Sequence, residues 1–335
     1  MPSVRTFAVV LILVATSVGA QQSSLVTQRP DPDGVPTRVS IGFFIIDVVE
    51  IDDVAQTFKT DVIATISWTD PRLALPPDAV DRADRIFALG QLWNPALTLV
   101  NRRNADILAP DLARVTADGG VTFEARRFAE LASPLDLKDF PFDTQVLRMD
   151  IASTRYGPDE VELVVDDATS GRLGNFSLSG WRVELGEITV SQIDLQGGGR
   201  LVRVVRHLDA EREGGFFVMK VIVPLGLIIF MSATVFWVDP ENIGPQLGIS
   251  TASVLTLIAF QFSLVRMLPR VSYLTRIDLF VLGSMILVFL ALAEAIYTSR
   301  ITKAGRHDDA RRVDYYARLV YPVAFVLLVV FTLVV

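Results

Sequence analysis

The sequence contains no cysteine and only two histidines among its 335 residues. Without thiols the chain forms no disulfide and no zinc–thiolate site, so an exported domain of this chain must be held together by packing alone. A histidine cluster, a Gly-rich phosphate loop and a Gly-x-Ser-x-Gly motif are also missing from the sequence. These are the usual signs of an enzyme, and we therefore predict no catalytic residue, no metal site and no cofactor.

A long basic block is the second absence. The formal net charge is -7 at pH 7, and no run of Lys or Arg is long enough to engage a phosphate backbone, so nucleic acid is not an expected partner. Apolar residues are in excess instead, at 51%. That proportion is typical of a membrane protein with a sizeable soluble portion.

The N-terminal residues have the pattern of a targeting segment. Residues 1–20 contain Arg5, a short apolar run and small residues before Gln21, which predicts a secretory signal peptide. Residues 21–37 contain three prolines among polar neighbours, which predicts a flexible N-terminal segment.

Residues 38–212 show the period-two pattern of half-buried strands. Apolar residues fall on alternate positions at Ile41, Phe43, Ile45, Val49 and Ile51, and again at Trp181, Val183 and Leu185. Turn sequences such as Asp118-Gly119-Gly120 separate the runs, and no helical pattern interrupts them. The segment predicts an all-β, immunoglobulin-like sandwich of two sheets.

Residues 213–335 are dominated by apolar runs and predict a transmembrane domain. We expect helices at about 216–238, 242–266, 277–299 and 314–335. Basic residues gather between the third and fourth runs, at Arg300, Lys303, Arg306, Arg311 and Arg312. By the positive-inside rule this link is cytoplasmic, which places the β domain and the C-terminus outside a multi-pass protein of the cell (inner) membrane.

The second run differs from the other three. It has 24 residues without a formal charge between Glu241 and Arg266, enough to cross a bilayer as a helix. It also carries hydroxyl and amide side chains at Gln246, Ser250, Thr251, Ser253, Thr256, Gln261 and Ser263. Such groups cost free energy in hydrocarbon unless they find partners or water. A pore-lining helix and a helix buried among its neighbours both satisfy them, and the residues alone leave the two open.

A secreted β-sandwich followed by four helices, the second of them polar, resembles the pentameric ligand-gated ion channels, or Cys-loop receptor superfamily. The short cytoplasmic link and the missing cysteines resemble its prokaryotic branch. The strongest piece is SPLDLKDFPFDTQVL, which is similar to the family's signature loop, with Ser133 and Leu147 at the places of the two cysteines. Other matches are Trp68-Thr-Asp-Pro-Arg-Leu73, Trp93-Asn-Pro95 with Asn101, Arg212 twelve residues before Pro224, and LPRVSY ending at Tyr273.

The resemblance implies a homopentamer around a central pore. Its register puts Gly248, Ala252, Leu255, Ala259, Phe262 and Arg266 on the pore face, with Leu255 and Phe262 as apolar gating rings. The inner mouth holds Glu241, Gly244, Pro245 and Gln246, which match neither the glutamate ring of cation channels nor the Pro-Ala-Arg of anion channels. Five copies of Glu241 favour cations at the inner mouth, whereas Arg266 at the outer end opposes them, and we expect a cation channel. The alternatives to these roles are that Leu255 and Phe262 only pack against neighbouring helices and that Glu241 only caps the start of a helix.

The resemblance also implies a coupling site and a ligand site. Coupling involves Arg212 with Asp143 of the signature loop and Asp53, or alternatively Asp52, together with Phe140 and Pro141. The ligand site lies under the hairpin Gln192–Arg200, where Val100, Thr154 and Ile63 replace the aromatic residues of amine receptors and Tyr156 is the only nearby ring. A quaternary amine is therefore not expected. Arg102, Arg103 and Arg155 are candidates for a carboxylate ligand, and protons acting on Asp and Glu side chains are the other stimulus.

Two other classes of function compete with a channel. One is a membrane-anchored sensor whose sandwich binds a ligand and whose helices conduct nothing. The other is a transporter, which four spans without an internal repeat disfavour. The partners expected of a channel are four further copies of the chain, the lipid bilayer, permeant ions, and a small-molecule ligand or protons.

Overall fold

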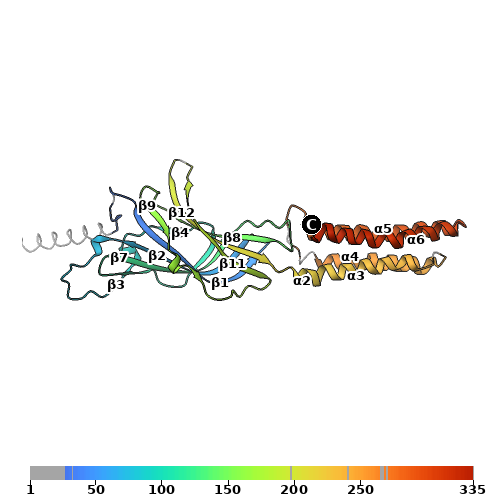
Figure 1. Ribbon diagram of the computed structural model, residues 1–335, viewed down its shortest axis with the longest axis horizontal. Helices are drawn as coiled ribbons and strands as arrows, with labels where there is room; N and C mark the ends of the chain where they lie inside the picture. The colour runs from blue at the N-terminus through green and yellow to red at the C-terminus, as the bar shows by residue number, and fades with distance from the viewer. Residues whose placement is uncertain are drawn as a thin grey trace, which may run out of the picture. The chain divides into compact units, whose positions relative to one another are not determined.

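The computed structural model describes residues 27–334 except 32, 197, 240, 265–267, 269 and 270 (Figure 1). The predicted signal peptide and the pore-face residue Arg266 lie outside these residues. The chain divides into two units. The first comprises residues up to 134, 146–179 and 183–210, and the second comprises residues 135–145, 180–182 and 211 onwards.

The first unit is a β-sandwich, as the sequence predicts. In the described part of the chain the larger sheet has eight strands, in the order β10-β1-β2-β7-β6-β3, with β5 on β7 and β9 on β1. Its strands are β1 (Thr37–Asp52), β2 (Thr57–Thr69), β3 (Arg85–Ala88), β5 (Arg102–Ile107), β6 (Leu112–Val115), β7 (Gly120–Ala132), β9 (Val161–Val165) and β10 (Gly171–Arg172).

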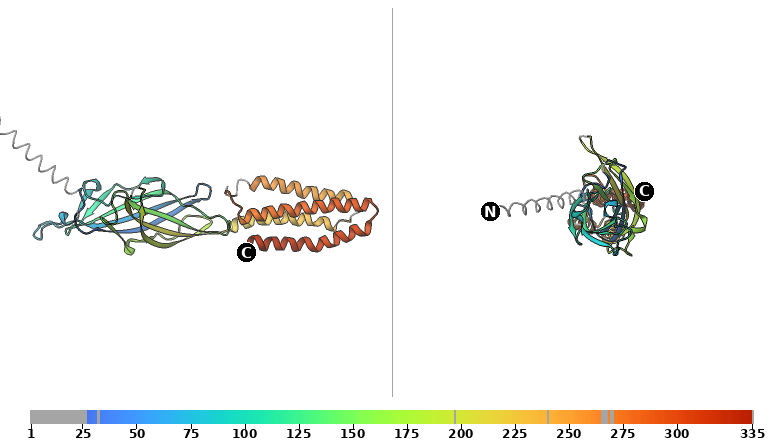
Figure 2. Two further views of the ribbon diagram at one scale, coloured as in Figure 1. Left: turned by 90° about the horizontal axis from the view of Figure 1, so that it is seen from above. Right: turned by 90° about the vertical axis from the view of Figure 1, so that its left-hand side faces the viewer.

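The smaller sheet has the order β11-β12-β8-β4. Its strands are β4 (Leu97–Leu99), β8 (Thr144–Ser153), β11 (Trp181–Asp194) and β12 (Arg200–Arg212). Short 3-10 turns η1 (Pro71–Leu73), η2 (Leu89–Gln91) and η3 (Asp167–Thr169) lie between strands. Figure 2 shows the long strands twisting along the sandwich, as expected from the right-handed twist of β-strands.

Strand β1 follows the predicted alternation only in its first half. Ile41, Phe43 and Ile45 are fully buried. The pairing of β1 with β2 then shifts register twice, between Ile45 and Asp47 and between Val48 and Glu50. Each extra residue reverses the alternation, so Val48 is buried and Val49, predicted to be inside, is exposed. The prediction for Val49 is wrong for this reason.

Three of the motif residues hold the sandwich together. Trp68 makes an edge-to-face contact with Trp93 at 5.7 Å between ring centroids. The side chain of Asn101 donates to the carbonyl of Ala132, at 2.8 Å, and to that of Arg148, at 2.7 Å. Because Ala132 ends β7 and Arg148 lies in β8, Asn101 joins the two sheets.

The second unit contains helices that run side by side in Figure 2. The first path runs through α2 (Gly215–Phe217), the π-helical segment η4 (Val218–Ile222), α3 (Val223–Ala233) and the 3-10 turn η5 (Thr234–Trp237). The others are α4 (Ile243–Leu264), α5 (Arg276–Lys303) and α6 (His307–Val329), which continues as η6 (Val330–Val334). In the described residues, four helical stretches are long and apolar enough to cross a membrane.

The link between α5 and α6 is shorter than predicted. Helix α5 continues to Lys303 and α6 begins at His307, not near residue 314. Gly305, at φ +78, makes the tight turn between them in a conformation that suits glycine. Four of the five basic residues that suggested a loop are therefore in helical ends, and Arg306 lies in the short link. Charge marks where a helix leaves the hydrocarbon, and the helix itself continues into water because its backbone hydrogen bonds are internal.

Polar contacts fix the ends of the helices. Thr275 and Asp278 form a reciprocal capping box that starts α5. The hydroxyl of Tyr321 on α6 lies 2.6 Å from that of Ser232 on α3, and its ring lies 5.1 Å from the ring of Phe236. These contacts hold α6 against the end of the first helical path.

Candidate functional site

The centre of the predicted coupling site is an ion pair within the second unit. The guanidinium of Arg212 donates from Nε to Oδ1 of Asp143 at 2.7 Å and from Nη2 to Oδ2 at 3.3 Å. The backbone N–H of Arg212 also donates to the carbonyl of Asp143, at 3.0 Å. Arg212 is 8% exposed and Asp143 is 2% exposed. A two-point contact in a dry setting fixes both position and orientation.

Aromatic rings enclose the guanidinium of Arg212. Its centre lies 4.0 Å from the Trp181 ring and 4.7 Å from that of Phe140. Phe140 in turn makes an edge-to-face contact with Phe217, at the start of the helices, at 4.6 Å. The same loop packs so closely on Gly214 that a Cβ atom there would lie 2.7 Å from the Phe142 ring. Cation–π contacts of this kind stabilise a buried arginine.

Gln145 completes the carboxylate's surroundings. Its Nε2 donates to Oδ2 of Asp143 and to the carbonyl of Asp136, each at 2.6 Å. Its Oε1 accepts from the N–H of Asp136 at 3.0 Å. Gln145 thus ties the two ends of the signature loop together. The pKa of Asp136 lies below its ordinary value because its carboxylate accepts from the backbone N–H and the ammonium of Lys138.

The signature loop also binds the segment that leads into α5. The N–H of Leu137 donates to the hydroxyl of Tyr273 at 2.9 Å. The N–H of Arg276 donates to the carbonyl of Lys138, at 3.0 Å, and Nε of Arg276 donates to Asp139 at 2.7 Å. The loop therefore contacts both the start of the first helical path and the start of α5.

The two alternative partners of Arg212 lie in the first unit, Asp52 at the end of β1 and Asp53 in the turn that follows. The carboxylate of Asp52 accepts from the N–H groups of Val54 and Ala55, at 2.8 Å each. The carbonyl of Asp53 accepts from the side chain of Gln56 at 2.7 Å. Asp52 is therefore engaged in shaping its own turn. The participation of either aspartate in coupling stays a prediction.

Helix α4 has two opposite faces. Its buried residues, which face the rest of the unit, are Gln246, Ser250, Ser253, Leu257 and Leu264. The predicted pore residues Gly248, Ala252, Leu255, Ala259 and Phe262 are all exposed, Leu255 by 62% and Phe262 by 75%. At 3.6 residues per turn these five fall within about 80° of the helix circumference and opposite the buried set. The subunit leaves this stripe uncovered.

Three hydroxyl groups of α4 are satisfied within the helix. Ser250, Ser253 and Thr256 donate to the carbonyls four residues earlier, at 3.0, 2.9 and 2.8 Å. The amide of Gln246 is buried, and in the described part of the chain neither its oxygen nor its nitrogen has a hydrogen-bond partner. Of the four residues predicted at the inner mouth, Gly244 and Pro245 are exposed and Gln246 faces its own subunit.

Glu241, the fourth of these residues, contacts α6. Its carboxylate lies 3.2 Å from the guanidinium of Arg311 and 3.5 Å from Nδ1 of His307. Glu241 and both partners are about half exposed, so the pair is screened by water. The negative charge predicted for the inner mouth is thus partly compensated by the same chain.

A pocket lies beneath the hairpin of β11 and β12, where the ligand site is predicted. It has a volume of about 410 Å³. It brings together Arg102 and Thr154 from the predicted set with apolar residues, and its lining comprises Thr98, Leu99, Val100, Arg102, Ala152, Ser153, Thr154, Ile193, Leu195 and Leu201. Arg103 and Arg155 are exposed outside this lining. Tyr156 is buried, with its ring 5.6 Å from that of Trp93, so it belongs to the core.

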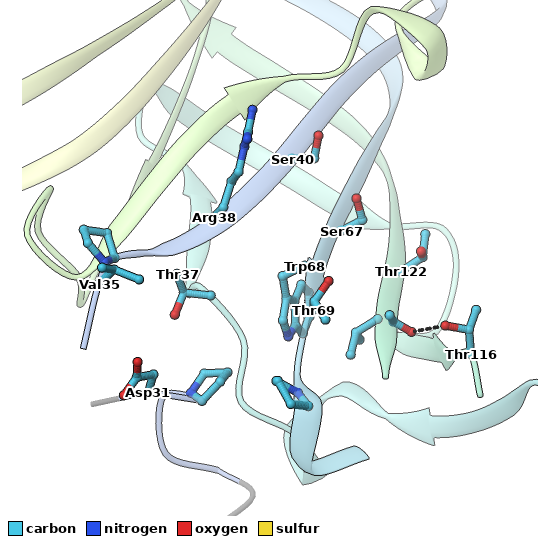
Figure 3. Close-up of a pocket in the computed structure, with 15 residues that line it drawn as sticks. Asp31, Val35, Thr37, Arg38, Ser40, Ser67, Trp68, Thr69, Thr116 and Thr122 are labelled. Atoms are coloured by element: carbon cyan, nitrogen blue, oxygen red, sulfur yellow. Dashed lines mark hydrogen bonds between the residues drawn. The ribbon is translucent and has the colours of Figure 1, made fainter. Parts of the chain in front are cut away.

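A second hollow of about 490 Å³ lies beside the N-terminal segment (Figure 3). Hydroxyl groups of β1, β2 and β7 line it, together with Arg38 and Trp68. None of the residues predicted to bind a ligand lies in its lining. It is therefore separate from the pocket beneath the hairpin.

Comparison with known proteins decides the family. The family described as neurotransmitter-gated ion-channel ligand binding domain matches residues 25–209. The family described as neurotransmitter-gated ion-channel transmembrane region matches residues 221–309. The chain belongs to the neurotransmitter-gated ion channel family. It is a multi-pass membrane protein of this family of pentameric ligand-gated channels, with an extracellular N-terminal sandwich, and the predicted fold class is confirmed.

Individual relatives agree with this assignment. The chain is 27% identical to the proton-gated ion channel of Gloeobacter violaceus over 305 residues, which is 90% of this chain and 84% of the relative. It is 27% identical over 277 residues to the glycine receptor subunit beta of Rattus norvegicus and of Homo sapiens. That match covers 79% of this chain and 55% of each receptor subunit. The resemblance to the prokaryotic branch of the family is confirmed.

Sequence reasoning missed three residues of the predicted coupling site. Gln145 and Trp181 contact Asp143 and Arg212 directly, and Tyr273 binds the signature loop. Trp181 was visible only as part of an alternating strand pattern, and Tyr273 only as the end of a motif. Gln145 lies two positions after Asp143, on the same side of an extended segment, which is the signal that points to it.

Proposed function

We propose that five copies of this chain form an ion channel whose pore is lined by α4 and is opened when an agonist or a proton acts on the sandwich. The observation that carries the proposal is the composition of the face that α4 leaves uncovered. It consists largely of small and hydroxyl-bearing residues: Gly244, Gly248, Thr251, Ala252, Thr256, Ala259 and Ser263.

The outer faces of the other helices differ in kind. Beyond the charged first turns of α6, exposed residues on α3 and α6 are mostly large and apolar, such as Leu227, Phe230 and Leu327. Such residues suit a surface that faces lipid tails. Exposed small and hydroxyl residues suit close packing against another helix or contact with water. Assembly of five subunits with α4 innermost satisfies both kinds of surface at once.

Leu255 and Phe262 are the large side chains in the α4 stripe, and we assign the gate to them. Ala252 and Ala259 flank Leu255 along the stripe, so the leucine projects beyond its neighbours. A ring of five leucines narrows the path and excludes water, and an ion then crosses only after the ring widens or becomes wet.

The pore we propose conducts cations. Asp239 and Glu241 precede α4 and are exposed, while Arg311 compensates Glu241 only in part. A negative ring at the inner mouth raises the local concentration of cations. The first turn of α4 contains no basic residue to oppose it.

The agonist we propose for the pocket beneath the hairpin is a small amphiphilic carboxylate. Arg102 supplies the cation, Thr154 supplies a hydroxyl, and Leu99, Leu195 and Leu201 supply apolar contact. Arginine matches a carboxylate in two-point geometry. Protons acting on carboxylates of the sandwich are the alternative stimulus, and the relative from Gloeobacter violaceus is proton-gated.

Reconstitution tests the proposal. Purified protein is placed in a planar bilayer under asymmetric salt, and a pH step and short aliphatic carboxylates are applied in turn. Stimulus-dependent current supports the proposal, and the reversal potential gives the ion sign. In parallel the mass in detergent is measured, and a homopentamer has five times the 36.9 kDa of one chain, less any cleaved leader. A stable monomer, or a pentamer that binds ligand without current, supports the non-conducting sensor instead.

A further inference from the structure

One end of the sandwich carries a row of small hydroxyl side chains on its outer surface. Ser40 of β1 lies opposite Ser67 of β2, and Ser67 lies opposite Thr122 of β7, so the row crosses three neighbouring strands. The adjacent residues Val39 and Ile66 point to the other face of the sheet and are buried in the core. The row therefore faces away from the core, and it forms the floor of the hollow of about 490 Å³ in Figure 3.

The outward positions further along the same strands are of a different kind. Lys59 pairs with Glu50 at 2.7 Å, and Arg126 pairs with Asp61 at 2.8 Å. Those side chains satisfy one another. The three hydroxyls of the row, by contrast, make no hydrogen bond within the described part of the chain, and they are only partly buried. Water or a ligand must therefore supply their partners.

The segment that precedes β1 forms one wall of the hollow, and two arginines fix it to the sandwich. Arg29, which is 7% exposed, donates to the carbonyl of Glu160 at 3.4 Å. Arg72 donates to the carbonyl of Gln28 at 2.8 Å and is held in turn by the buried carboxylate of Asp70 at 2.7 Å. Contacts on both sides of the wall keep it in place, so the hollow is a built feature of the fold.

The hollow combines opposite charges with a buried donor. Arg38 and Asp31 line it, and in the described part of the chain neither forms an ion pair. The other lining residues are uncharged, so the formal charges cancel. Trp68, which is 4% exposed, is also in the wall, and its indole N–H has no hydrogen-bond partner among the described residues. A neutral ligand suits this lining better than an anion or a cation.

Hydroxyl groups decide the class of the ligand. The lining contains Thr37, Ser40, Ser67, Thr69, Thr116 and Thr122. A hydroxyl both donates and accepts a hydrogen bond, whereas an oxyanion only accepts and an ammonium only donates. The complementary molecule is one that also does both, which is a property of alcohols. The volume lies in the range of pockets that take small molecules.

We propose that this hollow binds a neutral polyhydroxylated molecule of the size of a mono- or disaccharide. Its hydroxyls replace the water that satisfies the row, and Arg38 and Trp68 donate further hydrogen bonds. The site is separate from the pocket beneath the hairpin. Its occupancy is measured as binding and does not depend on the proposed channel activity.

Binding to the full-length protein in lipid nanodiscs tests the proposal, because a detergent with a sugar head group would compete for the site. Glucose, galactose, mannose and maltose are the neutral probes, and inorganic phosphate is the anionic probe. Saturation-transfer NMR detects binding, and a titration gives the Kd. We expect at least one of the sugars to bind, and to bind more tightly than phosphate.

Ser67→Ala/Thr122→Val removes two hydroxyls of the row. Because neither hydroxyl has a partner among the described residues, the variant leaves no polar group of that part of the chain unsatisfied, and it should keep the Tm of the wild type. The sugar should bind about tenfold more weakly, since two hydrogen bonds are lost. Thr65→Val is the matched control, because Thr65 lies on the same face of β2 but outside the lining, and it should bind as the wild type does.

Arg38→Gln separates charge from hydrogen bonding, since glutamine keeps a donor without the charge. It should retain most of the affinity for the sugar. Binding of phosphate that Arg38→Gln abolishes, without binding of any sugar, identifies an anion site and overturns the proposal. No binding of the four sugars overturns it as well. So does equal sugar binding by the wild type and Ser67→Ala/Thr122→Val, because the sugar then binds elsewhere.

Discussion

The guanidinium of Arg212 and the carboxylate of Asp143 form a two-point ion pair between the last residue of β12 and the signature loop, with Nε and Oδ1 2.7 Å apart. Gln145 and the rings of Trp181 and Phe140 surround the pair. A buried pair of this kind contributes little net stability, but removal of one partner is costly because the other charge is left without compensation. The pair is thus suited to transmit a movement of the strand to the loop.

Arg212→Ala should prevent opening. The substitution leaves Asp143 buried with its charge, at a cost of about 3–5 kcal/mol, so we expect weak assembly or pentamers without current. Arg212→Lys keeps the charge but not the planar fork and should recover part of the activity. Pentamer yield by size-exclusion chromatography and current at matched surface expression are the measurements. Wild-type currents from Arg212→Ala would contradict a coupling role.

Tyr273→Phe should make opening less responsive without harming assembly. It removes the acceptor for the N–H of Leu137, a contact worth about 0.5–1.5 kcal/mol, which corresponds to a shift of roughly 2–10-fold in the half-activating stimulus. Tyr316→Phe, which changes an exposed residue on α6, is the control and should have no effect. Equal responses from the two variants would mean that this hydrogen bond plays no part in coupling.

Leu255→Ser should open the channel more easily. Water enters a ring of serines, so the closed state is less stable relative to the open state. A change of about 1.4 kcal/mol in this free-energy difference lowers the half-activating stimulus tenfold. Some current should flow without any stimulus. Phe262→Ala should act in the same direction if both rings gate. Dose–response curves in a planar bilayer or in oocytes measure the shift.

Leu257→Ser is the control for the gate, because Leu257 is buried against its own subunit. It should lower thermal stability by the cost of a buried leucine replaced by a polar group, with little change in activation. A large shift in activation from Leu257→Ser together with none from Leu255→Ser would show that α4 is rotated in the assembled pore.

Glu241→Gln and Arg311→Gln should move ion selectivity in opposite directions. The first removes the carboxylate of the inner mouth and reduces the preference for cations. The second frees that carboxylate from its partner and increases the preference. Each change in permeability ratio should be no more than a few-fold, because an exposed pair is worth about 0–1 kcal/mol. Reversal potentials under asymmetric salt measure it, and an anion-selective wild type refutes the proposed sign.

Arg102→Gln should weaken activation by short aliphatic carboxylates about tenfold, the effect expected when a ligand loses an interaction of about 1.4 kcal/mol. Arg103→Gln is the matched control, since Arg103 is exposed outside the pocket. Activation curves for butyrate and its uncharged amide distinguish charge recognition from apolar contact. The same loss in both variants would argue for a general electrostatic effect on the surface.

Much of this architecture could be predicted from the sequence alone. Alternation with turn signals identified the sandwich, and the lengths of the apolar runs identified the spans, because burial imposes a period on strands and a length on membrane helices. The pairing of Arg212 with the acid of the signature loop also came from sequence, through the resemblance to a family whose loop carries an acid at that position. These features depend on local pattern or on motif spacing.

What depends on packing could not be predicted in this way. The phase of β1 after Ile45 is set by bulges in its pairing with β2, so Val48 and not Val49 is inside. Tyr156 is adjacent in sequence to the residues predicted to bind the ligand, yet its ring lies in the core against Trp93. Glu241 meets Arg311 across 70 residues of sequence. The sequence by itself determined the class of the protein and the order of its parts, because these follow from the periodicity and length of its apolar runs. Only the tertiary structure decided which polar groups meet, because such contacts are made between elements whose rotation and register no local pattern encodes.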